Sequence, residues 1–411
     1  MMRSLFAGVS GLKNHQTRMD VIGNNIANVN TIGFKSGRVS FQDVLSQTLQ
    51  GASAGSGGRG GTNPVQVGLG VGLASIDTLF TDGSFQPTGK QTDLAIQGAG
   101  FFILSDGLNQ VYTRAGAFDF DRLGNFVVPG TGYQVMGWLA DINGNIDTNA
   151  APTRITIPVG QTMPAQATTK VTYAYNLSAE AEVNTQVPVS IVVYDSQGNA
   201  YKLKGIFEKT GDNEWSFGNI EVIDPKGVTH PVAGATTIRF TAAGSFDSAD
   251  PLTIAFADTI SGQPLQITPD FSRLTQYGGE SSVQAVDADG YAAGVLEQTT
   301  IDTSGVIMGY FSNGQSQPLA RIALATFNNP GGLIKVGENL FAVSSNSGEP
   351  LIGTSGTGGR GTLSSGTLEM SNVDLAQEFT NMIITQRGFQ ANSKIITVTD
   401  EMLQELANLK R

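Results

Sequence analysis

The chain has 411 residues, of which 14% are charged and 52 are glycine, and its formal net charge at pH 7 is −11. This composition predicts several folded domains rich in strands and turns, and it excludes a disordered chain. The acidic balance argues against nucleic acid as a partner. There is no cysteine, which excludes disulfides and thiolate metal sites. No run of about 18 apolar residues occurs, so we expect no membrane insertion.

Residues 1–30 predict a helix with one apolar seam, because large apolar side chains recur there every seven positions. Three glycines, Gly8, Gly11 and Gly23, each weaken an isolated helix by about 1 kcal/mol, but they would let another backbone come close. Asparagines followed by Gly33 favour a helix end. The seam is formed by Leu5, Leu12, Met19, Ile22 and Ile26.

After this helix we expect a flexible or extended linker at residues 31–63. Its Gly/Ser tract, residues 51–61, buries too little apolar surface to be ordered by itself. A phosphate-binding loop is the alternative, but no Gly-Lys-Ser/Thr follows the tract, which argues against it. A second glycine-rich stretch near the C-terminus indicates a returning linker, which we place at residues 359–370.

Strand patterns fill the middle of the chain. Apolar residues alternate with polar residues and glycine from Val65 to Leu73, which predicts a half-buried strand. Turn signals such as Gly198-Asn199 then separate short apolar runs, as in a series of hairpins. Prolines between residues 151 and 164 indicate a domain boundary. We therefore predict a discontinuous inner β domain, residues 64–149 plus 285–358, and an outer β domain, residues 150–284.

Residues 371–411 predict a second long helix. Ser371 with Asp374 resembles a helix start, and large apolar residues again recur every seven positions. We expect the two terminal helices to pair, although two independent surface helices are the alternative. The fold class is thus multidomain and mainly β, with nested β domains and terminal α-helices pairing as a coiled coil in one assembly domain, residues 1–30 plus 371–411. The apolar positions of the second helix are Leu375, Phe379, Met382, Phe389, Ile396 and Leu403.

No group of residues in the sequence has the pattern of a catalytic site. The two histidines, His15 and His230, lie far apart in the sequence, and a packed or solvated role is the simpler reading of each. The acidic stretch Asp141–Asp147 has its glycine at the wrong place for a calcium loop, so we predict a hairpin turn there. We therefore expect no enzyme, no cofactor and no metal site.

The two ends of the chain carry long motifs that point to a family. Met19–Lys35 resembles the N-terminal signature of the bacterial flagellar axial proteins of the rod and hook. Ser371–Leu375 and Gln386–Asn392 resemble the C-terminal signature of the same family. The similarity extends inward through Val193–Asn199 and Asp212–Trp215. Two long signatures in the right order are highly specific.

The resemblance implies an extracellular structural protein of the bacterial flagellum that is exported unfolded by the flagellar type III apparatus. Such a subunit forms a homo-polymer, a curved hollow tube joining the rod to the filament. The implied partners are the distal rod, the hook–filament junction proteins, the hook cap during assembly and the export apparatus. The eleven apolar seam residues of the two helices are then candidates for the assembly interface.

Two other functions stay open at this stage. A distal rod subunit of the same family is one, because residues 48–63 resemble an insertion that the distal rod protein has in this region. The length and the outer domain argue against it. A β-rich surface adhesin or a hydrolase is a possibility from another class, but an adhesin has no need of heptads at both ends and a hydrolase requires a catalytic cluster.

Overall fold

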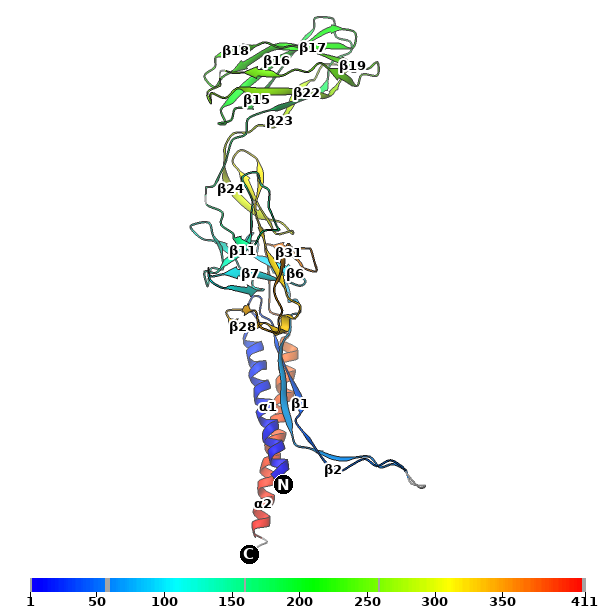
Figure 1. The fold of residues 1–411 in the computed structure, drawn as a ribbon, viewed down its shortest axis with the longest axis vertical. Helices are drawn as coiled ribbons and strands as arrows, with labels where there is room; N and C mark the ends of the chain where they lie inside the picture. Colours follow the sequence, from blue (N-terminus) through cyan, green and yellow to red (C-terminus); the bar gives the residue numbers. More distant parts are fainter. Residues whose placement is uncertain (1, 56–59, 159, 258, 409–411) are drawn as a thin grey trace. The chain divides into compact units, whose positions relative to one another are not determined.

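The computed structural model describes residues 2–55, 60–158, 160–257 and 259–408. Residues 1 and 409–411 of the predicted assembly domain and residues 56–59 of the predicted linker lie outside the described residues. The chain is mainly strand with one long helix near each end, which confirms the predicted class (Figure 1). It divides into two compact units, the first made of Met1–Pro158, Thr300–Met308 and Pro318–Arg411 and the second of Val159–Thr299 and Gly309–Gln317.

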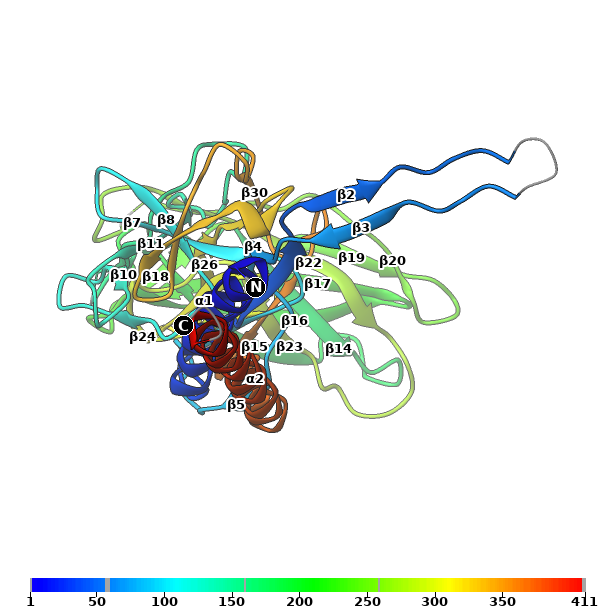
Figure 2. The ribbon, with the colours of Figure 1, turned by 90° about the horizontal axis from the view of Figure 1, so that it is seen from below.

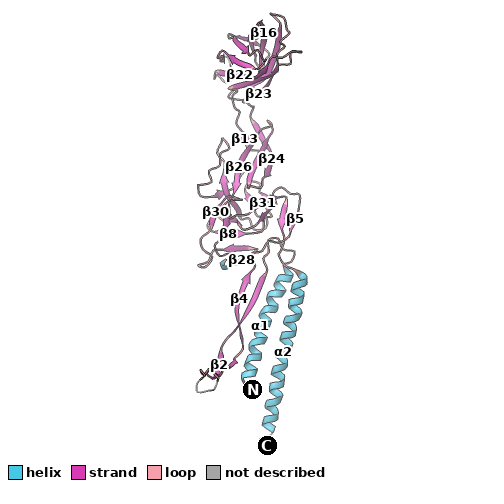
Figure 3. Ribbon diagram, turned by 90° about the vertical axis from the view of Figure 1, so that its right-hand side faces the viewer, coloured by secondary structure: helices cyan, strands magenta, loops and turns pink. Residues whose placement is uncertain are grey.

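The two helices, α1 (Met2–Ala27) and α2 (Leu375–Asn408), lie side by side in the first unit (Figure 3). The start of α2 differs from the prediction, because Asp374 and not Ser371 caps it. The Asp374 Oδ1 accepts hydrogen bonds from the backbone N–H of Ala376 at 2.8 Å and of Gln377 at 3.2 Å. A carboxylate at this position satisfies free N–H groups and faces the positive end of the helix dipole.

A long hairpin occupies most of the segment expected as the first linker. Strand β1 (Gly37–Asp43) pairs with β4 (Val71–Thr78), and β2 (Ser46–Gln50) pairs with β3 (Val65–Gly68). Figure 2 shows β2 and β3 projecting away from the helices. The strand expected over Val65–Leu73 is interrupted at Gly70, whose φ of 124° turns the backbone beside Ser10 of α1.

Strands also lie in the second segment expected as a linker. Within residues 359–370, β31 (Thr362–Ser365) pairs with β6 (Leu94–Gln97), and β32 (Thr367–Glu369) pairs with β5 (Phe85–Pro87). These pairings join the returning chain to strands that follow the hairpin. Both segments that we expected to be flexible or extended linkers therefore contain extended, paired strands.

The rest of the first unit is an antiparallel sheet with the order β26-β11-β7-β8-β29-β28. Its core contains Phe101, Ile103, Trp138 and Phe341. The elements are β7 (Phe101–Ser105), β8 (Gln110–Thr113), β9 (Asp119–Phe120), β10 (Phe126–Val127), β11 (Gln134–Leu139), β12 (Thr153–Arg154), β26 (Ser316–Ile322), β27 (Leu324–Thr326), η1 (Pro330–Gly332), β28 (Ile334–Gly337), β29 (Leu340–Ala342) and β30 (Leu351–Gly353).

The second unit packs two sheets around one apolar core. One sheet has the order β21-β22-β14-β23 and the other the order β15-β16-β17-β19-β20, with β18 on β17. Tyr173 and Phe271 from the first sheet meet Phe207 and Phe217 from the second. Its strands are β13 (Thr162–Met163), β14 (Lys170–Asn176), β15 (Gln186–Tyr194), β16 (Ala200–Gly211), β17 (Glu214–Ile223), β18 (Thr229–Val232), β19 (Thr236–Phe240), β20 (Phe246–Ala249), β21 (Ile254–Phe256), β22 (Leu265–Thr275) and β23 (Gln284–Ala288), while β24 (Gly294–Ile301), β25 (Val306–Phe311) and β26 contain residues of both units.

Candidate assembly interface

The contact between α1 and α2 depends on glycine. A Cβ atom added at Gly11 would lie 2.7 Å from the Asn392 Nδ2, and one added at Gly388 would lie 2.7 Å from the His15 Cε1. Both distances are well below van der Waals contact, so a larger residue at either position would force the facing side chain to move. His15 also packs edge-on against Phe41 of β1, with ring centroids 5.8 Å apart. The helix pair therefore meets at small residues.

The buried row on α2 is polar and differs from the apolar row expected from the sequence. Thr385 and Thr399 are buried, and Asn392 between them is the residue that faces Gly11. These three positions are spaced by seven, as in a heptad. Each threonine hydroxyl donates to a carbonyl of its own helix, Thr385 to Asn381 and Thr399 to Ile395, both at 2.7 Å. Hydropathy does not detect such a row, although its spacing together with the glycines of α1 could have.

The predicted interface residues fall into two groups. On α1, Ile22 is buried, and Leu5, Leu12, Met19 and Ile26 are partly covered. On α2, Met382 and Ile396 are partly covered, whereas the others remain exposed in the single chain. The exposed fractions are 39% for Leu375, 49% for Phe379, 39% for Phe389 and 38% for Leu403.

More apolar residues of α2 are exposed beside these. Ile383, Ile384 and Met402 are examples. A long helix with this much uncovered apolar surface is unusual for a protein that remains a single chain, and such patches mark interaction sites. The structure of one chain thus leaves apolar surface available to a neighbour.

Where the helices join the strands, four charged side chains form a group that we call the joint cluster: Lys35, Asp82, Arg114 and Glu369. Three of them are buried, whereas the Asp82 side chain at the edge of the group is 40% exposed. Lys35 and Glu369 have fully buried side chains, and the Lys35 Nζ lies 2.6 Å from the Glu369 Oε1. Arg114, 3% exposed, lies 3.5 Å from the Glu369 Oε2 and 3.2 Å from the Asp82 Oδ1. Two cations thus meet two carboxylates, and the cluster is neutral overall.

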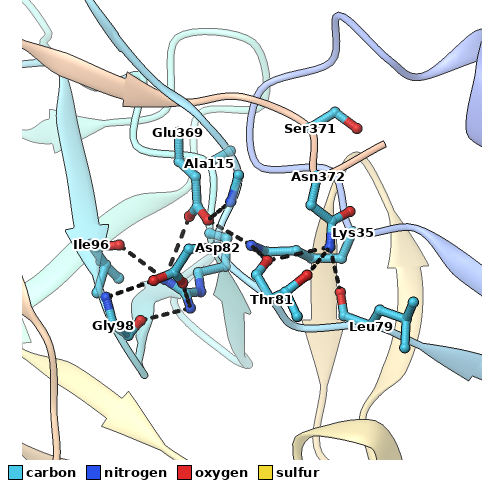
Figure 4. Close-up of polar contacts among 12 residues, drawn as sticks. Lys35, Leu79, Thr81, Asp82, Ile96, Gly98, Ala115, Glu369, Ser371 and Asn372 are labelled. Carbon is cyan, nitrogen blue, oxygen red and sulfur yellow. Dashed lines mark hydrogen bonds and ion pairs between the residues drawn. The ribbon is translucent and has the colours of Figure 1, made fainter. Parts of the chain in front are cut away.

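Backbone groups complete the joint cluster (Figure 4). The Lys35 Nζ donates to the Thr81 carbonyl at 2.7 Å, and the Gly83 N–H donates to the Glu369 Oε1 at 3.1 Å. The Arg114 guanidinium donates to the carbonyls of Ile96 and Gly98. Burial lowers the pKa of Lys35, and the hydrogen bond and charge of Glu369 offset part of that effect.

The segment between α1 and β1 is held on several sides. The Gly33 N–H donates to the Glu369 backbone carbonyl at 2.8 Å, and the Ser36 N–H donates to the Asn372 Oδ1 at 2.8 Å. Asn25 of α1 exchanges two hydrogen bonds with the backbone of Gly37. The start of residues 31–63, the segment expected to be a flexible or extended linker, is therefore held by hydrogen bonds to α1 and to the segment before α2.

Neither a metal cluster nor a spanning helix is found in the described part of the chain. Among residues 2–55, 60–158, 160–257 and 259–408, no three side chains of His, Cys, Asp or Glu gather as metal ligands would. No helix in these ranges is long and apolar enough to cross a membrane.

Four family profiles match parts of the chain, including a segment near each terminus. They are the Flagella basal body rod protein family at residues 5–35, the Flagellar hook protein FlgE/F/G D1 domain at residues 95–172, the Flagellar basal body protein FlaE D2 domain at residues 162–291, and the Flagellar basal body rod FlgEFG protein C-terminal family at residues 364–409. The terminal matches include both signatures noted in the sequence.

Individual relatives agree with these profiles. The flagellar hook protein FlgE of Borreliella burgdorferi is 44% identical over 457 residues, covering 100% of each chain, and that of Treponema pallidum is 43% identical over 465 residues, again covering 100% of each. The crystal structure of Helicobacter pylori flagellar hook protein FlgE2 has a similar fold, with a TM-score of 0.54 at 17% identity over 69% of this chain and 100% of that one. The chain therefore belongs to the flagellar hook protein family.

Proposed function

We propose that this chain polymerises with itself into the curved, hollow helical tube of a flagellar hook, which transmits torque from the rod to the filament. The observation that carries the proposal is the apolar surface of α2, exposed at Leu375, Phe379, Phe389 and Leu403 in a single chain. Contacts between different faces of identical subunits give an open helical polymer, so each added subunit could cover this surface on its neighbour.

The assembly interface that we propose consists of the eleven seam residues of the two helices. Burial of one large apolar side chain between subunits stabilises the contact by roughly 1.5–3 kcal/mol. Four of the six positions on α2 are exposed in the single chain, and the other two are only partly covered. The positions are Leu5, Leu12, Met19, Ile22 and Ile26 on α1, and Leu375, Phe379, Met382, Phe389, Ile396 and Leu403 on α2.

Other parts of the proposal rest on membership of the family. We propose residues 1–30 plus 371–411 as the assembly domain, and residues 64–149 plus 285–358 and 150–284 as the inner and outer β domains. The partners we propose are the distal rod, the hook–filament junction proteins, the hook cap and the export apparatus. On this proposal the chain is a structural subunit of the flagellum, located outside the cell, with no catalytic role.

The interface is tested by placing a charge on it. We expect Phe389→Asp and Leu403→Asp to give soluble chains with native strand content that form no tubes, because each substitution would bury a carboxylate between subunits. Gln390→Asp is the matched control, since it adds the same charge at a neighbouring exposed position. Electron microscopy of the purified chains scores tube formation. Normal tubes from Phe389→Asp would exclude this surface from the interface.

The place of the subunit in the flagellum is tested by deletion of its gene. Complete rods without a hook, seen by electron microscopy of basal bodies, are the expected result. Truncated rods would assign the chain to the distal rod instead. Intact flagella would overturn both assignments.

A further inference from the structure

We propose that the joint cluster locks the direction in which α1 and α2 leave the β part of the first unit, and that this direction sets the curvature of the assembled tube. The inference rests on the proposed function, because it concerns the shape of the polymer. It adds a role for Lys35, Asp82, Arg114 and Glu369 that the interface on the helices does not include.

The four side chains of the joint cluster come from both helix exits and from the β part of the first unit. Lys35 lies between α1 and β1, and Glu369 ends β32 shortly before α2. Arg114 follows β8, and Asp82 precedes β5, so these two belong to the β part of the unit. Because Glu369 binds both Lys35 and Arg114, one carboxylate ties the exits of the two helices to the same β framework.

Buried charges constrain geometry more than they add to the free energy of unfolding. A buried ion pair adds little net stability compared with apolar residues of the same size, because desolvation offsets the attraction. It does impose geometry, since each charge is favourable only when it faces its partner. A neutral cluster with short contacts of 2.6 Å and 3.2 Å therefore holds one arrangement and penalises others.

The segments between the joint cluster and the helices have backbones held by hydrogen bonds. Asn372 accepts from the Ser36 N–H and donates to the Leu79 carbonyl at 2.9 Å, so it joins both helix exits to the strand β4 and the segment after it. The Lys335 Nζ donates to the Lys35 carbonyl at 3.2 Å. A small rotation at the cluster is thus passed to the helices without being absorbed by a loose connection.

The test separates geometry from stability with a double substitution. Lys35→Met or Glu369→Gln alone leaves the cluster with an unbalanced buried charge, so each should lower the denaturant midpoint of the purified chain. Lys35→Met with Glu369→Gln restores neutrality and keeps an oxygen for the Gly83 N–H. We expect this double variant to recover most of the midpoint but to form tubes of altered curvature. Lys90→Met is the control, because it removes an exposed ion pair to Asp119 elsewhere in the same unit.

Two measurements read the outcome, namely tube curvature by electron microscopy and hydrogen exchange of the Gly33 and Ser36 amides. The proposal expects exchange at both amides to rise at least tenfold in the double variant and to stay unchanged in Lys90→Met. A double variant with native exchange and wild-type tubes would overturn the lock. Absence of tubes from the unaltered chain would instead refute the proposed function.

A second variant keeps the test decisive if the double variant does not fold. Asn372→Ala removes the link between Ser36 and Leu79 without disturbing a buried charge. We expect folded chains whose tubes differ in curvature from the wild type. Wild-type curvature in folded Asn372→Ala tubes would contradict the lock as well.

Discussion

At the scale of single residues, one aspartate-centred turn recurs through both units. In Asp195–Asn199 the Asp195 Oδ1 accepts from the backbone N–H of Gln197 at 3.0 Å and of Asn199 at 2.8 Å, and Gly198 takes a φ of 85°. The segment Asp141–Asn145 forms the same bonds, with its Oδ1 accepting from Asn143 and Asn145. The stretch that superficially resembles a calcium loop is thus a hairpin turn, as predicted.

Burial distinguishes these two turns and gives a matched pair of substitutions. Asp195 is buried and Asp141 is exposed. We expect Asp195→Ala to lower the free energy of unfolding by about 1–3 kcal/mol, because it removes a buried acceptor of two partly buried hydrogen bonds, and Asp141→Ala to lower it by less. The two tryptophans, Trp138 and Trp215, lie in different units, so the fluorescence of chains that keep only one of them, Trp215→Phe or Trp138→Phe, reports each unit separately in denaturant. Equal losses from both variants would contradict this account.

A second prediction at this scale concerns acid. The hydrogen bond from Lys170, whose Nζ lies 2.7 Å from the carboxylate, lowers the pKa of Asp270 from 3.8 to about 2. Since the folded-state pKa is depressed, this group contributes stability above its unfolded pKa, and the contribution is lost as pH falls from about 4 towards about 2.

Asp270→Asn should therefore weaken the second unit at neutral pH and reduce its further loss of stability in acid. Lys170 is more than half exposed, so solvent screening keeps the effect small. Denaturant midpoints of Trp215 fluorescence at about pH 6 and pH 2.5 measure it. An Asp270→Asn chain with the full acid sensitivity of the wild type would show that Asp270 is not responsible.

At the scale of elements, glycines decide how the helices meet. Gly11 of α1 faces Asn392, whereas a Cβ added at Gly23 of the same helix would meet nothing within 4 Å. Both positions are glycine, so the same substitution changes helix propensity equally at each. Gly11 permits the close approach of α2, whereas Gly23 faces open space.

Gly11→Val should separate the helices and abolish tube formation, because the added side chain would overlap Asn392. Gly23→Val carries the same change in helix propensity and should leave assembly intact. Electron microscopy of tubes and circular dichroism of the helices measure the two variants. Tubes in equal yield from both would rule out a role for the close approach.

The sequence predicted the elements better than their contacts. Both terminal helices and the turn at Gly198-Asn199 follow from periodicity and turn chemistry, which are local. The pairing face of α2 did not follow, because Thr385, Asn392 and Thr399 have no hydrophobic signal and depend on glycines in a distant helix. The joint cluster was missed for the same reason, since nothing local in the sequence relates Lys35 to Glu369.

At the scale of the whole molecule, the two units depend differently on the chain ends. The buried residues of the second unit's core lie within residues 171–283, far from either chain end. The first unit needs both ends of the chain. Lys35 near one end pairs with Glu369 near the other end, and strand β32, which contains Glu369, pairs with β5.

Deletion of residues 367–411 should therefore affect the two units unequally. Lys35 and Arg114 would lose Glu369, and two buried cations would share only Asp82, so the transition of Trp138 should shift to lower denaturant or disappear. The transition of Trp215 should stay within error of the wild type. A Trp138 transition unchanged by the deletion would show that the first unit does not need the C-terminal segment.

The ion pair between Lys35 and Glu369 joins residues at opposite ends of the polypeptide. If the chain is exported end first, as we propose, this contact can close only after the strand that ends at Glu369 has left the channel. The second unit can fold sooner, while the joint and the helix pair wait for the trailing end. The order in which the segments emerge therefore sets the order in which they fold, and a subunit that is still emerging has not yet formed the joint cluster that would orient its helices in a growing polymer.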